Sequence, residues 1–104
     1  MNELGPVPFL LLAAGLFLAG VVCLILQRNA IITLLGVELI FNAAVVNFIT
    51  TAAFAPSFEI EGETFALVVA VLALLEAVLG LAIIGNYRAQ RGTVDLNAGR
   101  ELKG

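Results

Sequence analysis

The stretch Ala30–Phe54, AIITLLGVELIFNAAVVNFITTAAF, is almost wholly apolar and is long enough to cross a bilayer as a helix, which takes about 20 residues. Similar apolar segments lie on either side of it, at residues 6–26 and 64–86. A chain in lipid must satisfy its own backbone hydrogen bonds, and so few segments cannot close a barrel. The sequence therefore predicts an all-α integral membrane protein with three transmembrane helices in a single membrane domain, residues 1–104.

The composition supports membrane insertion and excludes several functions. Hydrophobic residues make up 62% of the chain and charged residues 12%, which leaves too little polar surface for a water-soluble globule. The net charge of −3 provides no cationic surface, so we expect no nucleic-acid partner. The chain has no histidine, one cysteine and one methionine, so we expect no metal site and no cofactor of its own. Cys23 is interpreted as a small packed hydrophobic residue.

The basic residues predict the orientation of the chain in the membrane. Arg28 lies in the first connection, and the others follow the third apolar segment: Arg88, Arg91, Arg100 and Lys103. By the positive-inside rule both regions are cytoplasmic. The N-terminus is then outside, on the periplasmic side, and the C-terminus is cytoplasmic with a polar tail at 87–104. The short connection at residues 27–29 makes the first two helices antiparallel neighbours.

The second connection carries three acidic residues, Glu59, Glu61 and Glu63. Runs of like charge usually face water and carry no chemistry. We therefore interpret this segment as a solvated acidic loop on the outer side.

Two further carboxylates, Glu38 and Glu76, lie inside the apolar segments. At 1.5 Å per residue they lie about 12 Å and about 15 Å from the cytoplasmic ends of their helices, at nearly the same depth. An ionised acid there costs roughly 2.5–3.5 kcal/mol on insertion scales, and a glutamate is too short to reach the interface. Because burial favours the neutral acid, such a group can gain and lose a proton near physiological pH, as a proton relay requires.

The alternative is that each acid stays protonated and only holds helices together, by a hydrogen bond worth about 0.6–2 kcal/mol. Two acids at matching depth on separate helices favour the relay. Asn42 follows Glu38 by one turn on the same face, where it could donate a hydrogen bond to the carboxylate or help hold water. Asn47 projects from the opposite side and is interpreted as an interhelical hydrogen-bonding residue.

Small residues recur at spacings of three or four near Glu76, and they predict a surface on which another helix packs closely. They are Ala66, Ala70, Ala73, Ala77 and Gly80. Three helices bury little between them, so we expect both acids to face partner subunits or further copies of this chain.

Residues 35–43, LGVELIFNA, and 75–82, LEAVLGLA, resemble the two signature segments of subunit K of proton-pumping NADH:quinone oxidoreductase, respiratory complex I. The resemblance covers nearly the whole chain, from the short basic connection ending in Arg28-Asn29 to the polar tail. One departure is Gln27, where the family often has a second basic residue, so a role for this connection depends on Arg28 alone.

The resemblance implies that Glu38 and Glu76 are proton-pathway glutamates, supported by Asn42 and Arg28, in a multi-pass subunit of the bacterial inner membrane. The chain would be a non-redox part of the translocase, coupling electron transfer from NADH to quinone with proton translocation. Quinone, NADH, flavin and iron-sulfur clusters are expected in other subunits. The implied partners are membrane-arm subunits, including antiporter-like subunits and the quinone-site subunits, together with the lipid bilayer.

Other membrane proteins share parts of this pattern. The small subunit of multisubunit cation/proton antiporters has three helices but lacks the acid of the second helix. The ring subunit of rotary ATP synthases has two helices and one acid. A structural membrane adaptor, with neutral acids that only hold helices together, remains an alternative of a different class.

Overall fold

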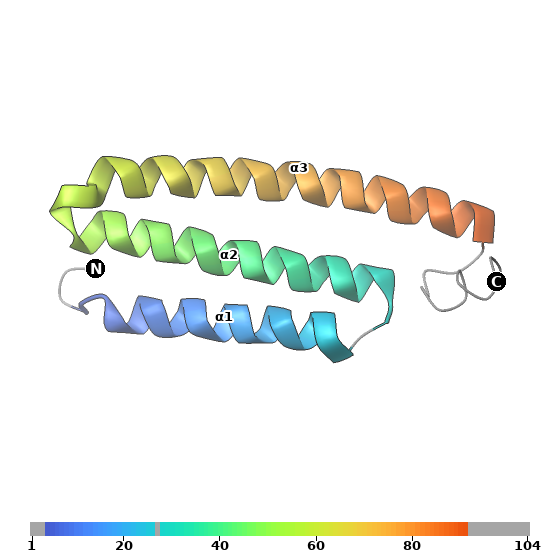
Figure 1. Cartoon of the computed structure of the whole chain (residues 1–104), viewed down its shortest axis with the longest axis horizontal. Helices are drawn as coiled ribbons and strands as arrows, with labels where there is room; N and C mark the ends of the chain where they lie inside the picture. The colour runs from blue at the N-terminus through green and yellow to red at the C-terminus, as the bar shows by residue number, and fades with distance from the viewer. Residues whose placement is uncertain (1–3, 27, 92–104) are drawn as a thin grey trace.

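The computed structural model describes residues 4–26 and 28–91, and these form three long helices (Figure 1). Helix α1 spans Val7–Leu26, α2 spans Ala30–Phe54 and α3 spans Glu59–Arg91, with the short 3₁₀ helix η1, Pro56–Phe58, between α2 and α3. Each of the three long helices is apolar and long enough to cross a membrane. The predicted all-α fold with three membrane-spanning helices is confirmed in the described part of the chain.

The predicted limits of the third helix, 64–86, are wrong at both ends. Glu59, Glu61 and Glu63 form the first turns of α3 and do not lie in a loop, although all three are exposed as expected. Acidic side chains favour a helix N-terminus, where unpaired N–H groups point outward. Residues 87–91, placed in the polar tail by hydropathy, continue α3, and residues 92–104 lie outside the described part. Hydropathy marks the apolar stretch of a helix and not its ends.

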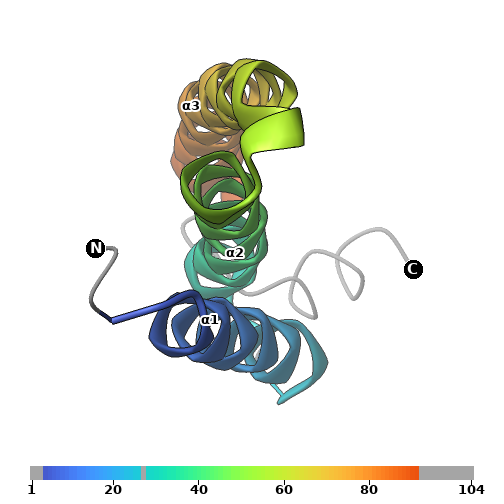
Figure 2. The same ribbon diagram turned by 90° about the vertical axis from the view of Figure 1, so that its left-hand side faces the viewer.

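The helices lie side by side in a row with α2 in the middle (Figures 1 and 2). Helix α2 packs along α1 and along α3, whereas α1 and α3 have no extensive contact with each other within the described residues. Consecutive helices run in opposite directions, which confirms the predicted antiparallel arrangement of α1 and α2 (Figure 1). A row of this kind leaves two broad faces of α2 open instead of enclosing a core.

Small residues make both helix contacts. The buried positions are Ala13 and Gly20 in α1, Gly36, Ala43, Thr50 and Ala52 in α2, and Gly62, Ala66 and Ala73 in α3. A Cβ atom on Gly20 would lie 2.6 Å from the carbonyl oxygen of Gly36, so the α1 and α2 backbones touch. This contact requires glycine, as in membrane helices that cross at small residues.

The predicted small-residue surface of α3 packs against α2 of the same chain. Ala66 and Ala73 are buried there, whereas Ala70 is exposed. A Cβ atom on Gly62 would lie 2.8 Å from the carbonyl oxygen of Phe48. The rings of Phe48 and Phe65 add a tilted aromatic contact with centroids 5.6 Å apart.

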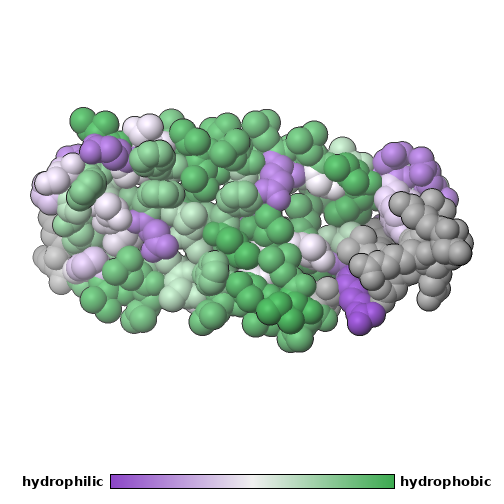
Figure 3. All heavy atoms as spheres, viewed as in Figure 1, coloured by the Kyte–Doolittle hydropathy of each residue, from purple (hydrophilic) through white to green (hydrophobic). Residues whose placement is uncertain are grey.

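Large apolar side chains cover the outside of the molecule. On the face shown in Figure 3 the middle is mostly hydrophobic and hydrophilic residues gather toward the two ends. Exposed residues such as Ile25, Leu74 and Ile83 keep between 65% and 72% of their surface open. Such a surface suits contact with lipid or with other membrane helices.

Candidate functional site

The packing of α2 on α3 sets Glu38 and Glu76 at the same level. Gly80, one turn after Glu76, lies against the side chain of Leu34, one turn before Glu38. Farther along, Gly62 lies against Ala52. The number of residues from Gly62 to Glu76 along α3 equals the number from Glu38 to Ala52 along α2. Because the two helices are antiparallel, both contacts require the two acids to lie opposite each other. The matching depth inferred from the sequence is therefore a property of the fold.

The Oε1 atom of Glu38 is buried and has no hydrogen-bond partner among the described residues. A buried polar atom without a partner is costly, so this position favours a hydrogen-bond partner from water or from another molecule. The sequence predicted matching depth and contact with other subunits; in the structure the two acids also lie on adjacent faces of packed helices.

Glu76 lines an open groove between α2 and α3 with a volume of about 580 Å³. The other residues that line it are glycine or apolar: Leu34, Phe41, Leu72, Leu75, Leu79, Gly80 and Ile83. Glu76 is thus the carboxyl group that a neighbouring molecule in this groove would meet. The buried oxygen of Glu38 is shielded by the chain itself.

Asn42 does not form the hydrogen bond to Glu38 that the sequence suggested. Its side chain is exposed, and within the described residues no hydrogen bond joins it to the Glu38 carboxyl. An i, i+4 spacing brings two side chains to one face but does not make them turn toward each other. The alternative, that Asn42 helps hold water beside the acid, stays a prediction.

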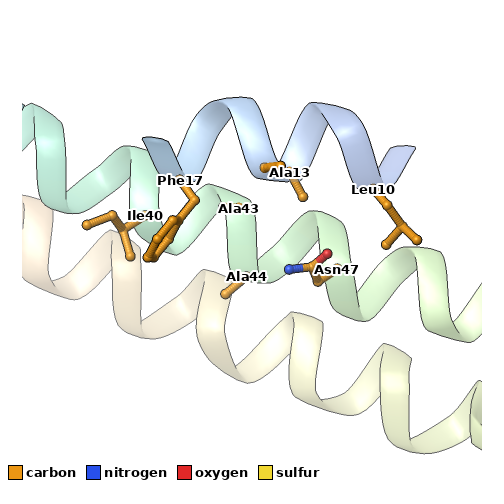
Figure 4. Close-up of a pocket in the computed structure, with 8 residues that line it drawn as sticks. Leu10, Ala13, Phe17, Ile40, Ala43, Ala44 and Asn47 are labelled. Carbon is orange, nitrogen blue, oxygen red and sulfur yellow. The ribbon is translucent and has the colours of Figure 1, made fainter. Parts of the chain in front are cut away.

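Asn47 lies in a second groove, between α1 and α2, of about 470 Å³ (Figure 4). Leu10, Ala13 and Phe17 line it from α1, and Ile40, Ala43 and Ala44 line it with Asn47 from α2 (Figure 4). The Asn47 amide makes no hydrogen bond to another side chain in the described part of the chain. A helix that Asn47 joins by hydrogen bonding would have to belong to another molecule.

Arg28 is exposed in the first connection, next to the residue that caps α2. The Oδ1 atom of Asn29 accepts a hydrogen bond of 2.8 Å from the N–H of Ile31. This connection lies at the same end of the molecule as the C-terminal end of α3, which carries Arg88 (Figure 1). The two basic regions described by the structure thus share one end. Gln27 lies outside the described residues.

Cys23 is half-buried and free, and its Cβ atom packs beside Gly36. Among the described residues no group of three or more Asp, Glu, His or Cys residues is placed to hold a metal ion.

Sequence reasoning missed Leu34 and Phe41 as neighbours of Glu76. Both are ordinary apolar residues, and their role depends on how α3 packs on α2. The sequence did contain one signal for Leu34. Leu34 lies one turn before Glu38, and Gly80 lies one turn after Glu76. This spacing becomes informative only when α2 and α3 are known to be antiparallel neighbours.

The chain is similar to known proteins over nearly its whole length. Residues 8–104 match the family described as NADH-ubiquinone/plastoquinone oxidoreductase chain 4L. The chain is 38% identical over 103 residues to NADH-quinone oxidoreductase subunit K of Thermomicrobium roseum, covering 99% of each protein. It is 40% identical over 90 residues to NAD(P)H-quinone oxidoreductase subunit 4L of a Synechococcus species, covering 86% of this chain and 88% of the relative. The chloroplastic subunit 4L of Chlorokybus atmophyticus is 37% identical over 94 residues, which cover 90% of this chain and 93% of the relative. This chain therefore belongs to the family of NADH-quinone oxidoreductase subunit K, also named chain 4L.

Proposed function

We propose that this chain, as a membrane-arm subunit of NADH:quinone oxidoreductase, couples electron transfer from NADH to quinone with proton translocation through Glu38 and Glu76. The observation that carries the proposal is the placement of the two acids at one level on adjacent apolar helices, with Glu76 lining an open groove. Family membership supports the oxidoreductase over the small subunit of a cation/proton antiporter.

The pair has the properties of a proton relay. Two negative charges repel strongly in a medium of low dielectric, so loss of a proton from one carboxyl group favours protonation of the other. Two such groups at one level provide neighbouring sites between which a proton can pass through water. Glu76, which lines the open groove, exchanges a proton with a neighbouring subunit, and Glu38 exchanges a proton with Glu76 through water that Asn42 helps to hold.

The redox chemistry belongs to other subunits, which hold quinone, NADH, flavin and iron-sulfur clusters. This chain contributes a non-redox step of the translocase. Its partners are the antiporter-like subunits and the quinone-site subunits of the membrane arm. In a bacterial inner membrane its N-terminus faces the periplasm and its C-terminus the cytoplasm. The connection between α1 and α2, which carries Arg28, lies at the same end of the molecule as the C-terminal end of α3, which carries Arg88, and this supports the orientation (Figure 1).

The unpartnered oxygen of Glu38 weighs against a structural adaptor. An acid that served only to join helices would be expected to hydrogen-bond, because a neutral carboxyl group without a partner forfeits the contact that stabilises the pair. In the described part of the chain the buried Oε1 atom of Glu38 has no such contact. If the chain were a structural adaptor, Glu38 would need a hydrogen-bond partner from another subunit.

The test is Glu38→Gln in the intact membrane complex, with Glu61→Gln as the matched control at an exposed position of α3. Gln keeps hydrogen-bonding capacity but cannot release a proton. Assembly is checked on a native gel, and NADH-driven quinone reduction is measured with proton uptake into inverted vesicles. We expect both activities to drop sharply in Glu38→Gln and to persist in Glu61→Gln. An assembled Glu38→Gln complex that pumps at the normal rate would instead establish Glu38 as a helix-joining residue.

A further inference from the structure

One contact between α2 and α3 lies one turn from the two acids, where the side chain of Leu34 packs on Gly80. A Cβ atom on Gly80 would lie 2.8 Å from Cδ1 and 3.2 Å from Cδ2 of Leu34, so both methyl groups of Leu34 lie over the bare backbone of Gly80. A real Cβ atom almost never approaches another heavy atom that closely. Leu34 can lie here because position 80 has no side chain.

This contact lies where the distance between α2 and α3 matters most for the proposed relay. Leu34 is one turn from Glu38 and Gly80 is one turn from Glu76, and both residues line the groove that contains Glu76. The electrostatic interaction between two carboxyl groups weakens as their separation grows, and water-mediated proton exchange requires them to stay close.

We infer that Gly80 is a positioning residue, which receives Leu34 and thereby holds Glu76 of α3 within reach of Glu38 of α2. This inference depends on the proposed function of the two acids. It assigns no direct part in proton transfer to Gly80 or Leu34, which carry no titratable group.

The contact predicts a graded response to side-chain size. The Leu34 methyl groups lie at the end of a flexible side chain, so they can move aside for the single Cβ atom of Gly80→Ala. The side chain in Gly80→Leu is too large for that adjustment and must push α3 away from α2. Added volume in a packed contact is accommodated by movement of the backbone and the neighbouring side chains.

Gly85 offers a matched control in the same helix. A Cβ atom there would have no atom within 4 Å, so Gly85→Leu adds the same side chain to α3 without touching α2. The rescue variant combines Gly80→Leu with Leu34→Ala, which empties the space that the new side chain needs. If the effect of Gly80→Leu comes from this contact, the two substitutions must be strongly non-additive.

The experiment uses the assembled complex in inverted vesicles, with native gels to normalise for assembly. We expect Gly80→Leu to lower quinone reduction and proton uptake roughly tenfold and Gly80→Ala to lower them less than about twofold. The pH dependence of the residual activity must also change, since the coupling of the two acids changes. The titratable groups concerned are Glu38 of α2 and Glu76 of α3; α1, which packs on α2, adds only Cys23 within the described residues. Gly85→Leu must leave both readouts unchanged, and Leu34→Ala must restore them in the double variant.

An assembled Gly80→Leu complex with normal activity and pH profile would overturn the inference, as would a loss that Leu34→Ala does not relieve. If Gly80→Leu prevents assembly, Gly80→Val replaces it and must meet the same rescue criterion. Glu38→Gln distinguishes failure of the proposed function from failure of the positioning role of Gly80. Normal pumping in Glu38→Gln refutes the proposed function, whereas a defect in Glu38→Gln with none in Gly80→Leu refutes only the positioning role of Gly80.

Discussion

Glu38 and Glu76 lie opposite each other, at one level on adjacent antiparallel helices. Neither lies near a helix end, and Leu34 packs on Gly80 one turn away from both acids. Residues that serve one step act as a unit, so the effect of changing one depends on whether the other is present.

The double variant Glu38→Gln with Glu76→Gln tests this unit directly. We expect each single substitution to lower proton uptake on the order of a hundredfold, because proton transfer through a positioned group is lost. The double variant should be scarcely worse than either single variant, since a relay broken at one group gains nothing from the other. Proton uptake and quinone reduction in assembled complexes provide the cycle. Multiplicative losses would show that the two acids act in separate paths.

Gly20→Ala should destabilise the packing of α1 on α2. The added Cβ atom would lie 2.6 Å from the Gly36 carbonyl oxygen and 3.2 Å from the Ile40 backbone nitrogen, and backbone atoms cannot turn aside. We expect a loss of about 1–3 kcal/mol, seen as a lower temperature of dissociation of this subunit from the complex. Gly15→Ala is the control in the same helix, because a Cβ atom there has no atom within 4 Å. Equal behaviour of the two variants would contradict a backbone contact at Gly20.

Asn29→Ala should weaken the start of α2. The Asn29 side chain accepts a hydrogen bond from the Ile31 N–H, and loss of such a cap typically costs about 1 kcal/mol. Asn29→Asp keeps an acceptor at the same position and should retain most of the stability. Thermal dissociation of the assembled complex measures both variants. A similar loss in both would show that the amide group of Asn29 serves another contact.

Asn47→Leu tests whether the groove between α1 and α2 receives a hydrogen-bonding neighbour. An amide in an apolar setting is favourable only when it is hydrogen-bonded, and such bonds between membrane helices are worth about 0.6–2 kcal/mol. We expect Asn47→Leu to reduce the amount of assembled complex, whereas Asn47→Gln, which keeps the amide, assembles better. If Asn47→Leu assembles as well as the unsubstituted chain, the groove faces lipid.

Glu59→Gln should change stability without changing proton transfer. Glu59 begins α3 and is exposed, so its charge stabilises the helix N-terminus by about 0.3–1 kcal/mol in a salt-dependent way. Proton uptake by the assembled complex should stay normal. A pumping defect in Glu59→Gln would contradict the interpretation of the three exposed acids as solvated residues and would give them a part in the proton path.

Much of this protein follows from its hydropathy. Three long apolar stretches predict three helices because lipid offers the backbone no other hydrogen-bonding partner. The limits of α1 and α2 follow closely for the same reason, since their apolar residues end where the helices end. Glu38 and Glu76 are conspicuous in the sequence because a carboxyl group in an apolar stretch is costly and needs an explanation.

The pairing of those two acids depended on packing that no local pattern contains. Glu59 and its neighbours were expected in a loop because hydropathy reports where a helix leaves the apolar layer and not where its hydrogen bonds begin. The contact of Leu34 with Gly80, the absence of a bond from Asn42 to Glu38 and the row of helices with α2 in the middle all depend on which faces meet. Those faces are set by the fit of small residues such as Gly20, Gly36 and Gly62 against a neighbouring backbone, which is a property of two helices together.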